Sequence, residues 1–207
     1  MKEFSATMKQ VLQRGLPGPS AQRFMAPAGR VVGPFEEKDY PDARKASVMV
    51  LLYSRQDEVR TVLMERPSYD GVHSGQISFP GGGQEQQDAD AWQTAQRETM
   101  EEVGVTDIQL IGPLSPLYIP PSNFFVRPFL GWLPHEPVFV PDEQEVASIV
   151  EFPVHDLLLP SVKSTMMVER KDWRMEVPCY LIGGHQVWGA TAIILSELEA
   201  LLEKMDE

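Results

Sequence analysis

The spacing of apolar residues predicts the helices and strands near the two ends of the chain. Four apolar side chains recur at helical spacing within residues 1–15, which predicts an amphipathic helix there. The apolar run over residues 46–53 predicts a buried strand, and residues 59–66 predict its hairpin partner after a turn at residues 55–58. Residues 190–205 again carry apolar side chains at helical spacing and predict a final helix.

The middle of the chain adds strands around one polar helix. That helix is predicted over residues 88–103, because helix-forming residues are frequent there and Gly104 follows as a stop. Further strands are predicted at residues 108–119, 124–134 and 147–152, a short helix at residues 154–159, and a hairpin over residues 165–178 that turns near Lys171 and Asp172. This order is typical of an α+β fold with a mixed sheet between helices.

Length and composition favour one domain with an N-terminal extension. The chain has 207 residues, of which 43% are hydrophobic, which suits one core better than two. Prolines and glycines at residues 16–30 end the first helix, so we place a helix and arm at residues 1–44, packed on a domain at residues 45–207. The N-terminus lacks the apolar stretch of a signal peptide and no run of eighteen apolar residues occurs, so we expect a soluble, cytoplasmic protein.

Charge and cysteine content narrow the function classes. Thirty acidic and 18 basic residues give a formal net charge of −12, which disfavours binding to nucleic acids or anionic membranes. An anionic substrate would therefore need a metal ion or local cations. The single cysteine, Cys179, excludes an intramolecular disulfide and a cysteine-rich metal site, and its apolar neighbours predict a buried strand position.

The polar helix carries the candidate chemistry. Glu98, Glu101 and Glu102 fall within an arc of about 100° on its surface, where like charges repel one another. Arg97 is predicted to point away from the centre of this trio, so a divalent cation with oxygen ligands is the expected partner. A merely solvated acidic face is the alternative. The three glycines at residues 81–83 favour the first interpretation, because their backbone can approach a ligand closely.

These residues resemble a known family. The run from Arg97 to Val105 resembles the core of the Nudix box: Arg-Glu, a usually apolar residue, any residue, Glu-Glu, any residue, Gly and an apolar residue. The glycine and acid that the family places upstream match Gly82 and Asp88 if one residue is inserted before Arg97. The resemblance implies an α/β/α sandwich with a mixed sheet, and hydrolysis of a pyrophosphate bridge with Mg²⁺ or Mn²⁺.

A longer set of positions resembles the coenzyme A pyrophosphatase branch of the Nudix hydrolases. The matching residues are Arg66, His73, Gly75, Gln76, Phe79, Pro80, Gly81, Gly82, Glu85, Asp88, Thr94, Ala95, Arg97 and Glu98. Two basic positions of the branch are missing, because Gly83 stands where the branch has Lys and Gly71 where it has Arg.

The branch match implies that coenzyme A or acyl-coenzyme A is cleaved to 3′,5′-ADP and 4′-phosphopantetheine or its acyl form. The two missing cations leave ADP-ribose, NADH or another nucleoside diphosphate derivative open as the substrate. A nucleotide-binding Nudix domain without activity is a third possibility, against which the intact trio of glutamates argues.

Roles follow for the residues of the box. The metal is expected to be held by Glu98, Glu101, Glu102 and the carbonyl group of Gly82. The general base is open among Glu101, Glu102 and Glu145, because Glu145 matches a position where Nudix enzymes often hold a further acid.

Other residues of the motif are expected to support its structure. Arg97 should tie the helix to the acidic loop through Asp88 or Glu85, since a guanidinium group and a carboxylate fix each other's geometry. A role of Arg97 as a phosphate ligand is the alternative. Gly81 and Gly104 are expected to shape the turns before and after the helix.

A third group of residues is expected to contact the substrate. It consists of Arg44, Arg66, His73, Ser122, Asn123 and Arg127, of which the arginines could meet a polyanion. The partner is thus expected to be a small nucleotide. The N-terminal arm, which resembles the leader segment of the same branch, is also a candidate contact in a homodimer.

Overall fold

The computed structural model describes residues 2–67, 75–170 and 173–205, which form an α+β fold. The helices are α1 (Lys2–Gln13), α2 (Pro19–Gln22), α3 (Ala91–Val103) and α4 (Gly189–Glu203). The strands are β1 (Arg44–Arg55), β2 (Glu58–Glu65), β3 (Ile77–Ser78), β4 (Gly81–Gly83), β5 (Gln109–Pro113), β6 (Leu117–Ile119), β7 (Phe124–Leu133), β8 (Ser148–Pro153), β9 (Lys163–Arg170), β10 (Trp173–Ile182) and β11 (His185–Trp188). Short 3₁₀ turns are η1 (Arg23–Met25), η2 (Glu37–Asp39), η3 (Pro120–Ser122), η4 (Val154–Leu158) and η5 (Pro160–Val162).

A mixed sheet of eight strands forms the centre of the molecule. Its main order is β3-β2-β1-β7-β5, while β4 pairs with β1, β6 with β7 and β8 with β2. Strands β1 and β7 run parallel, and the other described pairs of this sheet are antiparallel. Strands β9, β10 and β11 form a separate antiparallel sheet. The predicted fold class is therefore confirmed.

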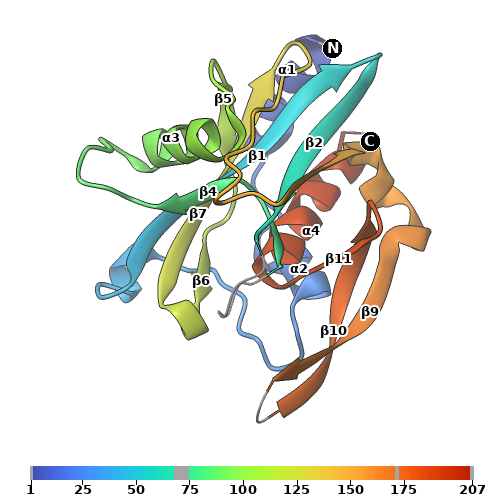
Figure 1. Cartoon of the computed structure of the whole chain (residues 1–207). Coiled ribbons are helices and arrows are strands. Elements are labelled where there is room, and N and C mark those ends of the chain that lie inside the picture. Colours follow the sequence, from blue (N-terminus) through green and yellow to red (C-terminus); the bar gives the residue numbers. More distant parts are fainter. Residues whose placement is uncertain (1, 68–74, 171–172, 206–207) are drawn as a thin grey trace.

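Both faces of the main sheet are covered, which explains the unbroken apolar run in β1. Met49, Leu51 and Tyr53 pack in the core under α3, whereas Val50 and Leu52 pack in the core that contains α1 and α4. Successive side chains of a strand point to opposite faces, so a strand buried on both sides needs apolar residues at every position. Figure 1 shows α3 on one side of the sheet and α1 and α4 on the other.

The predicted elements are largely present, with differences at their ends. The predicted strand at residues 108–119 is two strands, β5 and β6, because a proline follows each of Gly112 and Ser115 and interrupts the pairing. The predicted short helix after β8 is the 3₁₀ turn η4. Strands β9 and β10 form the predicted hairpin, whose turn residues Lys171 and Asp172 lie outside the described residues. Cys179 is a fully buried residue of β10, as predicted.

Helix α3 begins at Ala91, three residues later than predicted. Asp90 caps it, because its side chain accepts a hydrogen bond from the Gln93 N–H at 2.9 Å, and the Gln93 side chain accepts one from the Ala89 N–H at 2.9 Å. This reciprocal pair satisfies two amides that the helix start would leave free. Asp88 is thereby left in the loop before the helix.

The end of α3 is fixed by Gly104 and by a loop that packs on it. Gly104 has φ of 73°, and a Cβ atom there would lie 3.0 Å from the Val140 carbonyl oxygen. The Val140 N–H donates to the Val103 carbonyl at 2.9 Å, and the Asp142 N–H donates to the Glu102 carbonyl at 3.0 Å. These bonds satisfy carbonyl groups that a helix end leaves unpaired.

Replacing Gly104 with Ala should lower the free energy of unfolding by more than the ~1 kcal/mol expected of a left-handed alanine alone, because the new methyl group also meets Val140. Urea unfolding at neutral pH measures the loss. Gly184→Ala is the matched control, since Gly184 has φ of +83° and nothing within 4 Å of its Cβ position. Equal losses in the two variants would show that the contact with Val140 contributes nothing.

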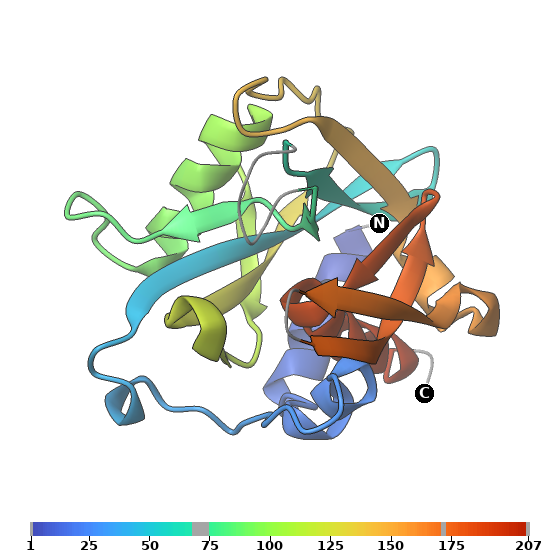
Figure 2. The same ribbon diagram turned by 60° about the horizontal axis from the view of Figure 1, so that its bottom comes forward.

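The N-terminal arm is tied to α4 through a buried carboxylate. Glu197 is fully buried and accepts hydrogen bonds from the Gly18 N–H at 3.1 Å, the Gln22 Nε2 at 3.1 Å and the Ser115 Oγ at 2.6 Å. Figure 2 shows the arm, in blue, running along one side of the molecule from α2 to β1.

Within the described ranges, no helix is long and apolar enough to cross a membrane.

Candidate active site

The glycine strand β4 brings the chain into close contact with β1 and with a glutamate of α3. Gly81, Gly82 and Gly83 pair with Val48, Ser47 and Ala46 of β1. A Cβ atom on Gly81 would lie 2.3 Å from the Ser47 carbonyl oxygen, and one on Gly82 would lie 2.5 Å from Oε2 of Glu98. Position 81 therefore requires glycine, because its closest neighbours are backbone atoms, whereas a Cβ atom at Gly82 would displace the Glu98 carboxylate.

Glu102 is a buried carboxylate at the junction of α3, β2 and β4. It is 1% exposed, and its Oε2 accepts a hydrogen bond from the Gly81 N–H at 2.7 Å. Arg66 Nη2 lies 3.3 Å from Glu102 Oε1 and also 3.3 Å from the Gly81 carbonyl oxygen. Burial raises the pKa of Glu102 to about 8, against the opposing effects of Gly81 and Arg66, and the charges of Glu98 and Glu145 add to the rise.

Glu98 is also close to other carboxylates of the site. Burial raises its pKa above the ordinary value, the contact with Arg97 opposes the rise, and the charges of Glu101 and Glu145 reinforce it. The charge of Glu145 thus acts on both Glu98 and Glu102.

Glu145 reaches this place because its loop is anchored on α3. The Asp142 N–H bonds the Glu102 carbonyl, and the Glu145 N–H donates in turn to the Asp142 carbonyl at 3.0 Å. Glu145 is exposed, in contrast to Glu102. The structure therefore brings one accessible acid from a distant loop to the buried acid of the box.

Arg97 is the main cation of the site. Its Nε donates to Asp88 Oδ1 at 3.0 Å and its Nη2 to Asp88 Oδ2 at 3.0 Å, while its Nη1 lies 3.9 Å from Oε1 of Glu85. This bidentate pair, with the N–H of Glu85 and the hydroxyl group of Thr94, lowers the pKa of Asp88 to about 2 despite its burial. The expected link between helix and acidic loop is present, and it runs mainly through Asp88.

The predicted direction of Arg97 is wrong. Its Nη1 contacts Glu98 at 2.9 Å and Glu101 at 2.8 Å, so it pairs with two of the three glutamates that it was expected to avoid. The reason is the length of the side chain, which lets the guanidinium group reach both the next residue and the residue one turn ahead.

The glutamates also do not converge as a ready set of metal ligands. In the described part of the chain, no three acidic, histidine or cysteine side chains are arranged to hold a metal ion. Arg97 contacts Glu98 and Glu101, whereas the Gly81 N–H and Arg66 contact Glu102. The residues nevertheless fit a hard divalent cation chemically, because they are carboxylates whose crowding and burial a positive ion would relieve.

The residues expected to contact substrate lie in separate groups. Arg66 is at Glu102, whereas the Arg44 guanidinium group stacks on the Phe124 ring at 3.9 Å and donates to the Ser122 carbonyl at 3.2 Å. Asn123 donates to the Asp42 carbonyl at 2.9 Å next to this second group. Arg127 pairs with Glu37 of the arm, and His73 lies outside the described residues. The three arginines therefore lie in different contacts, and their role in binding the substrate stays a prediction.

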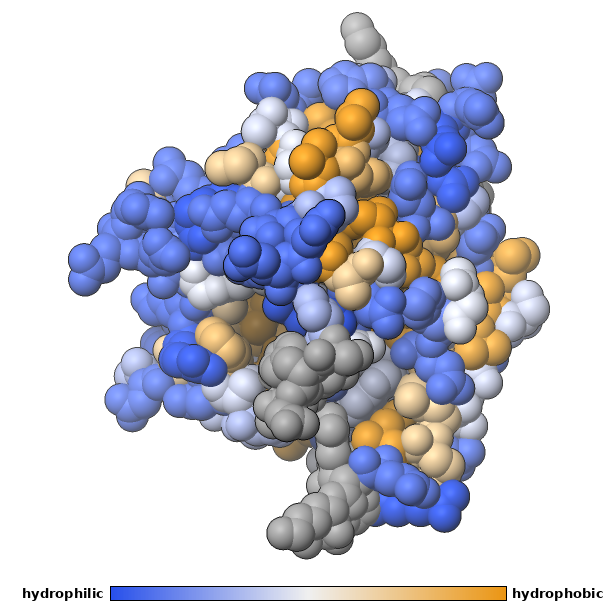
Figure 3. Space-filling model, viewed as in Figure 1, coloured by the Kyte–Doolittle hydropathy of each residue, from blue (hydrophilic) through white to orange (hydrophobic). Residues whose placement is uncertain are grey.

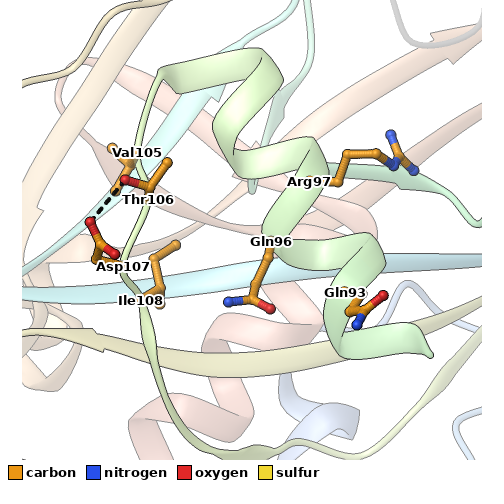
Figure 4. A pocket seen from close by; sticks show the side chains of 7 residues that line it. All are labelled: Gln93, Gln96, Arg97, Val105, Thr106, Asp107 and Ile108. Carbon is orange, nitrogen blue, oxygen red and sulfur yellow. Dashed lines mark hydrogen bonds between the residues drawn. The ribbon is translucent and has the colours of Figure 1, made fainter. Parts of the chain in front are cut away.

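A cavity beside α3 lies apart from the glutamates of the box. It has a volume of about 370 Å³ and is lined by Gln93, Gln96, Arg97 and the segment from Val105 to Ile108. Figure 4 shows the Arg97 side chain directed away from the other lining residues, and none of the box glutamates lines this cavity. Figure 3 shows that the loop before α3, which projects from the molecule, is strongly hydrophilic.

Known proteins that this chain resembles share one family. A profile of the NUDIX domain family matches residues 43–172. An uncharacterized Nudix hydrolase, NudL, of Pectobacterium atrosepticum is 34% identical over 158 residues, covering 75% of this chain and 81% of the relative. Its counterpart in Yersinia pestis is 31% identical over 157 residues, covering 75% of this chain and 78% of the relative.

Solved structures share the fold at low sequence identity. The NUDIX domain of Shewanella oneidensis NrtR, solved with ADP ribose, has a TM-score of 0.54 at 12% identity, covering 81% of this chain and 94% of the domain. A C. elegans Ap4A hydrolase in a binary complex has a TM-score of 0.51 at 17% identity, covering 78% of this chain and 98% of the hydrolase.

Proposed function

Because this chain belongs to the Nudix family of hydrolases, we propose that it is a metal-dependent pyrophosphohydrolase whose substrate is coenzyme A or acyl-coenzyme A. Cleavage between the two phosphorus atoms would give 3′,5′-ADP and 4′-phosphopantetheine or its acyl form. The observation that supports catalysis most directly is the buried carboxylate of Glu102, which lies beside the glycine strand and whose pKa is raised by burial and by the charges of Glu98 and Glu145.

The proposed metal site uses the carboxylates of the box. Glu98, Glu101 and Glu102, with the Gly82 carbonyl, would hold Mg²⁺ or Mn²⁺, which supplies neutralisation of phosphate charge and a lower pKa for the attacking water. Glu98 and Glu101 would have to turn away from Arg97 to face the ion. Arg97 would keep its bidentate pair with Asp88 and its 2.9 Å bond to the Gly83 carbonyl, so the helix would stay in place.

The general base is best sought among the accessible acids. A base must reach the attacking water, and Glu102 is 1% exposed, whereas Glu101 and Glu145 are exposed. We therefore assign the general base to Glu101 or Glu145, and we assign Glu102 as a metal ligand. Arg66 and the Gly81 N–H, which contact Glu102, would orient it.

The second candidate substrates are ADP-ribose and NADH. Gly71 and Gly83 stand where the coenzyme A branch has basic residues. With fewer cations to bind the 3′-phosphate of coenzyme A, substrates without this phosphate, such as ADP-ribose and NADH, are favoured. A NUDIX domain of the same fold binds ADP ribose. A domain that binds a nucleotide without cleaving it is the third candidate.

The homodimer contact and the cytoplasmic location stay predictions.

A substrate panel should show the highest kcat/KM for coenzyme A. The comparison is with 3′-dephospho-coenzyme A, ADP-ribose and NADH at one Mg²⁺ concentration, with products identified by mass and an EDTA-treated sample as the control. If ADP-ribose or NADH is preferred by more than about tenfold, which is about 1.4 kcal/mol in transition-state binding, the coenzyme A assignment is wrong and the broader hydrolase assignment survives.

A further inference from the structure

A second cavity lies on the α3 side of the main sheet, beside the first turn of α3. Its volume is about 180 Å³, and its lining includes Lys45 and Ser47 of β1, Phe125 and Arg127 of β7, and Ala91 of α3. The alternation along β1 puts Lys45 and Ser47 on the same face as Met49, which packs under α3. The cavity therefore opens on the sheet face that carries the box helix.

The strand register places this cavity next to the acidic group. Ser47 pairs with Gly82 on one side and with Arg127 on the other, so these three residues form one row across β4, β1 and β7. Neighbouring strands are about 4.8 Å apart, which puts the Arg127 backbone roughly 10 Å from Gly82. Since Gly82 lies against the Glu98 carboxylate, a nucleotide at the glutamates would have the cavity within reach.

The two cations of the cavity share one carboxylate from the arm. Glu37 in η2 contacts Lys45 Nζ at 2.6 Å through Oε1 and Arg127 Nη2 through its other oxygen. Lys45 and Arg127 together hold the pKa of Glu37 below its usual value. Among the described residues lining the cavity, the other acid is Asp90, which is engaged in capping α3.

We propose that Lys45 and Arg127 form a binding site for a phosphomonoester of the substrate, and that Glu37 occupies this site when the phosphate is absent. A phosphomonoester carries up to two negative charges and three acceptor oxygens, so it can engage both cations more fully than one carboxylate can. Glu37 lies on a short turn of the arm, whereas both cations lie on paired strands, so Glu37 is the group that would move. The inference rests on the proposed function only for the position of the pyrophosphate.

The test uses two nucleotides that contain no pyrophosphate bridge and differ by one phosphomonoester. Calorimetry should compare adenosine 3′,5′-bisphosphate with 5′-AMP on the full chain, without added divalent metal. Glu37→Gln should tighten binding of the bisphosphate about tenfold, because it frees both cations, and should tighten binding of AMP less, because AMP lacks the 3′-phosphate. Lys45→Gln and Arg127→Gln should each remove most of the preference for the bisphosphate, with thermal melting used to verify folding.

Glu36→Gln is the matched control. It removes the same charge one residue away, where Glu36 contacts the exposed Lys38 outside the cavity, and it should change neither affinity. The proposal is overturned if Glu37→Gln fails to bind the bisphosphate measurably, or if Glu36→Gln tightens binding equally. If the subsite behaves as expected while coenzyme A is not hydrolysed, the proposed substrate falls and the subsite stands. If coenzyme A is hydrolysed but Glu37→Gln leaves the preference for the bisphosphate unchanged, the subsite alone falls.

Discussion

Replacing Glu102 with Gln should lower kcat by at least about a hundredfold. The substitution keeps the size of the side chain and its ability to accept the Gly81 N–H, but it removes the charge that would hold a metal. A metal that contributes several kcal/mol to the transition state makes such a loss expected, at about 1.4 kcal/mol for each tenfold. Initial rates under saturating Mg²⁺ measure kcat, and titration with Mn²⁺ should show weaker metal binding.

A control variant separates this effect from a general change in charge. Glu143→Gln removes one charge from the loop that also carries Glu145, at an exposed position, and should retain nearly full activity. The thermal midpoint of the Glu102 variant should stay within a few degrees of the original protein. Near-normal turnover of Glu102→Gln at saturating metal would refute the ligand assignment.

Replacing Arg97 with Ala should lower the free energy of unfolding by about 3 kcal/mol and reduce activity as well. The Asp88 side chain is only 4% exposed, so the variant leaves a buried carboxylate without its bidentate partner. The Glu98 and Glu101 carboxylates also lose their shared cation. Urea unfolding and steady-state kinetics on the same variant measure both effects.

The pH dependence of unfolding should identify Asp88 as the source of this stability. Its pKa is about 2 in the folded protein and 3.8 without perturbation, so its contribution is complete above pH 3.8 and disappears as the pH falls through 2. The stability difference between the original protein and Arg97→Ala should therefore shrink by about 2 kcal/mol over this range.

The exposed Arg174, which pairs with Glu169, provides the surface control for Arg97. Arg174→Ala should cost less than about 1 kcal/mol. If Arg97→Ala instead raises KM with unchanged stability, Arg97 is a phosphate ligand and not a brace.

Local patterns predicted most elements of this fold because helices and hairpins depend on neighbouring residues. The apolar run at residues 46–53 and the turn at residues 55–58 predicted β1 and β2, and Gln56 and Asp57 have the positive φ angles of such a turn. The parallel pairing of β1 with β7 had no local signal, because it joins segments some eighty residues apart. The start of α3 was placed three residues too early because helix propensity did not identify Asp90 as the capping residue, which leaves Asp88 in the loop.

The candidate site was predictable in its residues but less so in its geometry. The box identified the glutamates, and the resemblance pointed to Glu145, yet the rotation of Arg97 toward two carboxylates depends on side-chain reach in three dimensions. Lys45 and Glu37 were missed. Lys45 could have been noticed in the sequence, because it is a charged residue on the α3 face of an otherwise apolar strand. Glu37 could not, because its position at the cavity depends on how the arm folds against the sheet.

Glu197 makes the two ends of the chain depend on each other. The family match covers residues 43–172, so both Glu197 and its donors Gly18 and Gln22 lie outside it, one on each side. Hydrogen bonds to a charged group contribute about 1.5–3 kcal/mol each, and a chain cut to the matched segment would lose α4 and the arm together. In a chimera with another Nudix protein, the N-terminal and C-terminal flanks must therefore be exchanged as a pair, since either one alone would leave a buried charge or its donors without a partner.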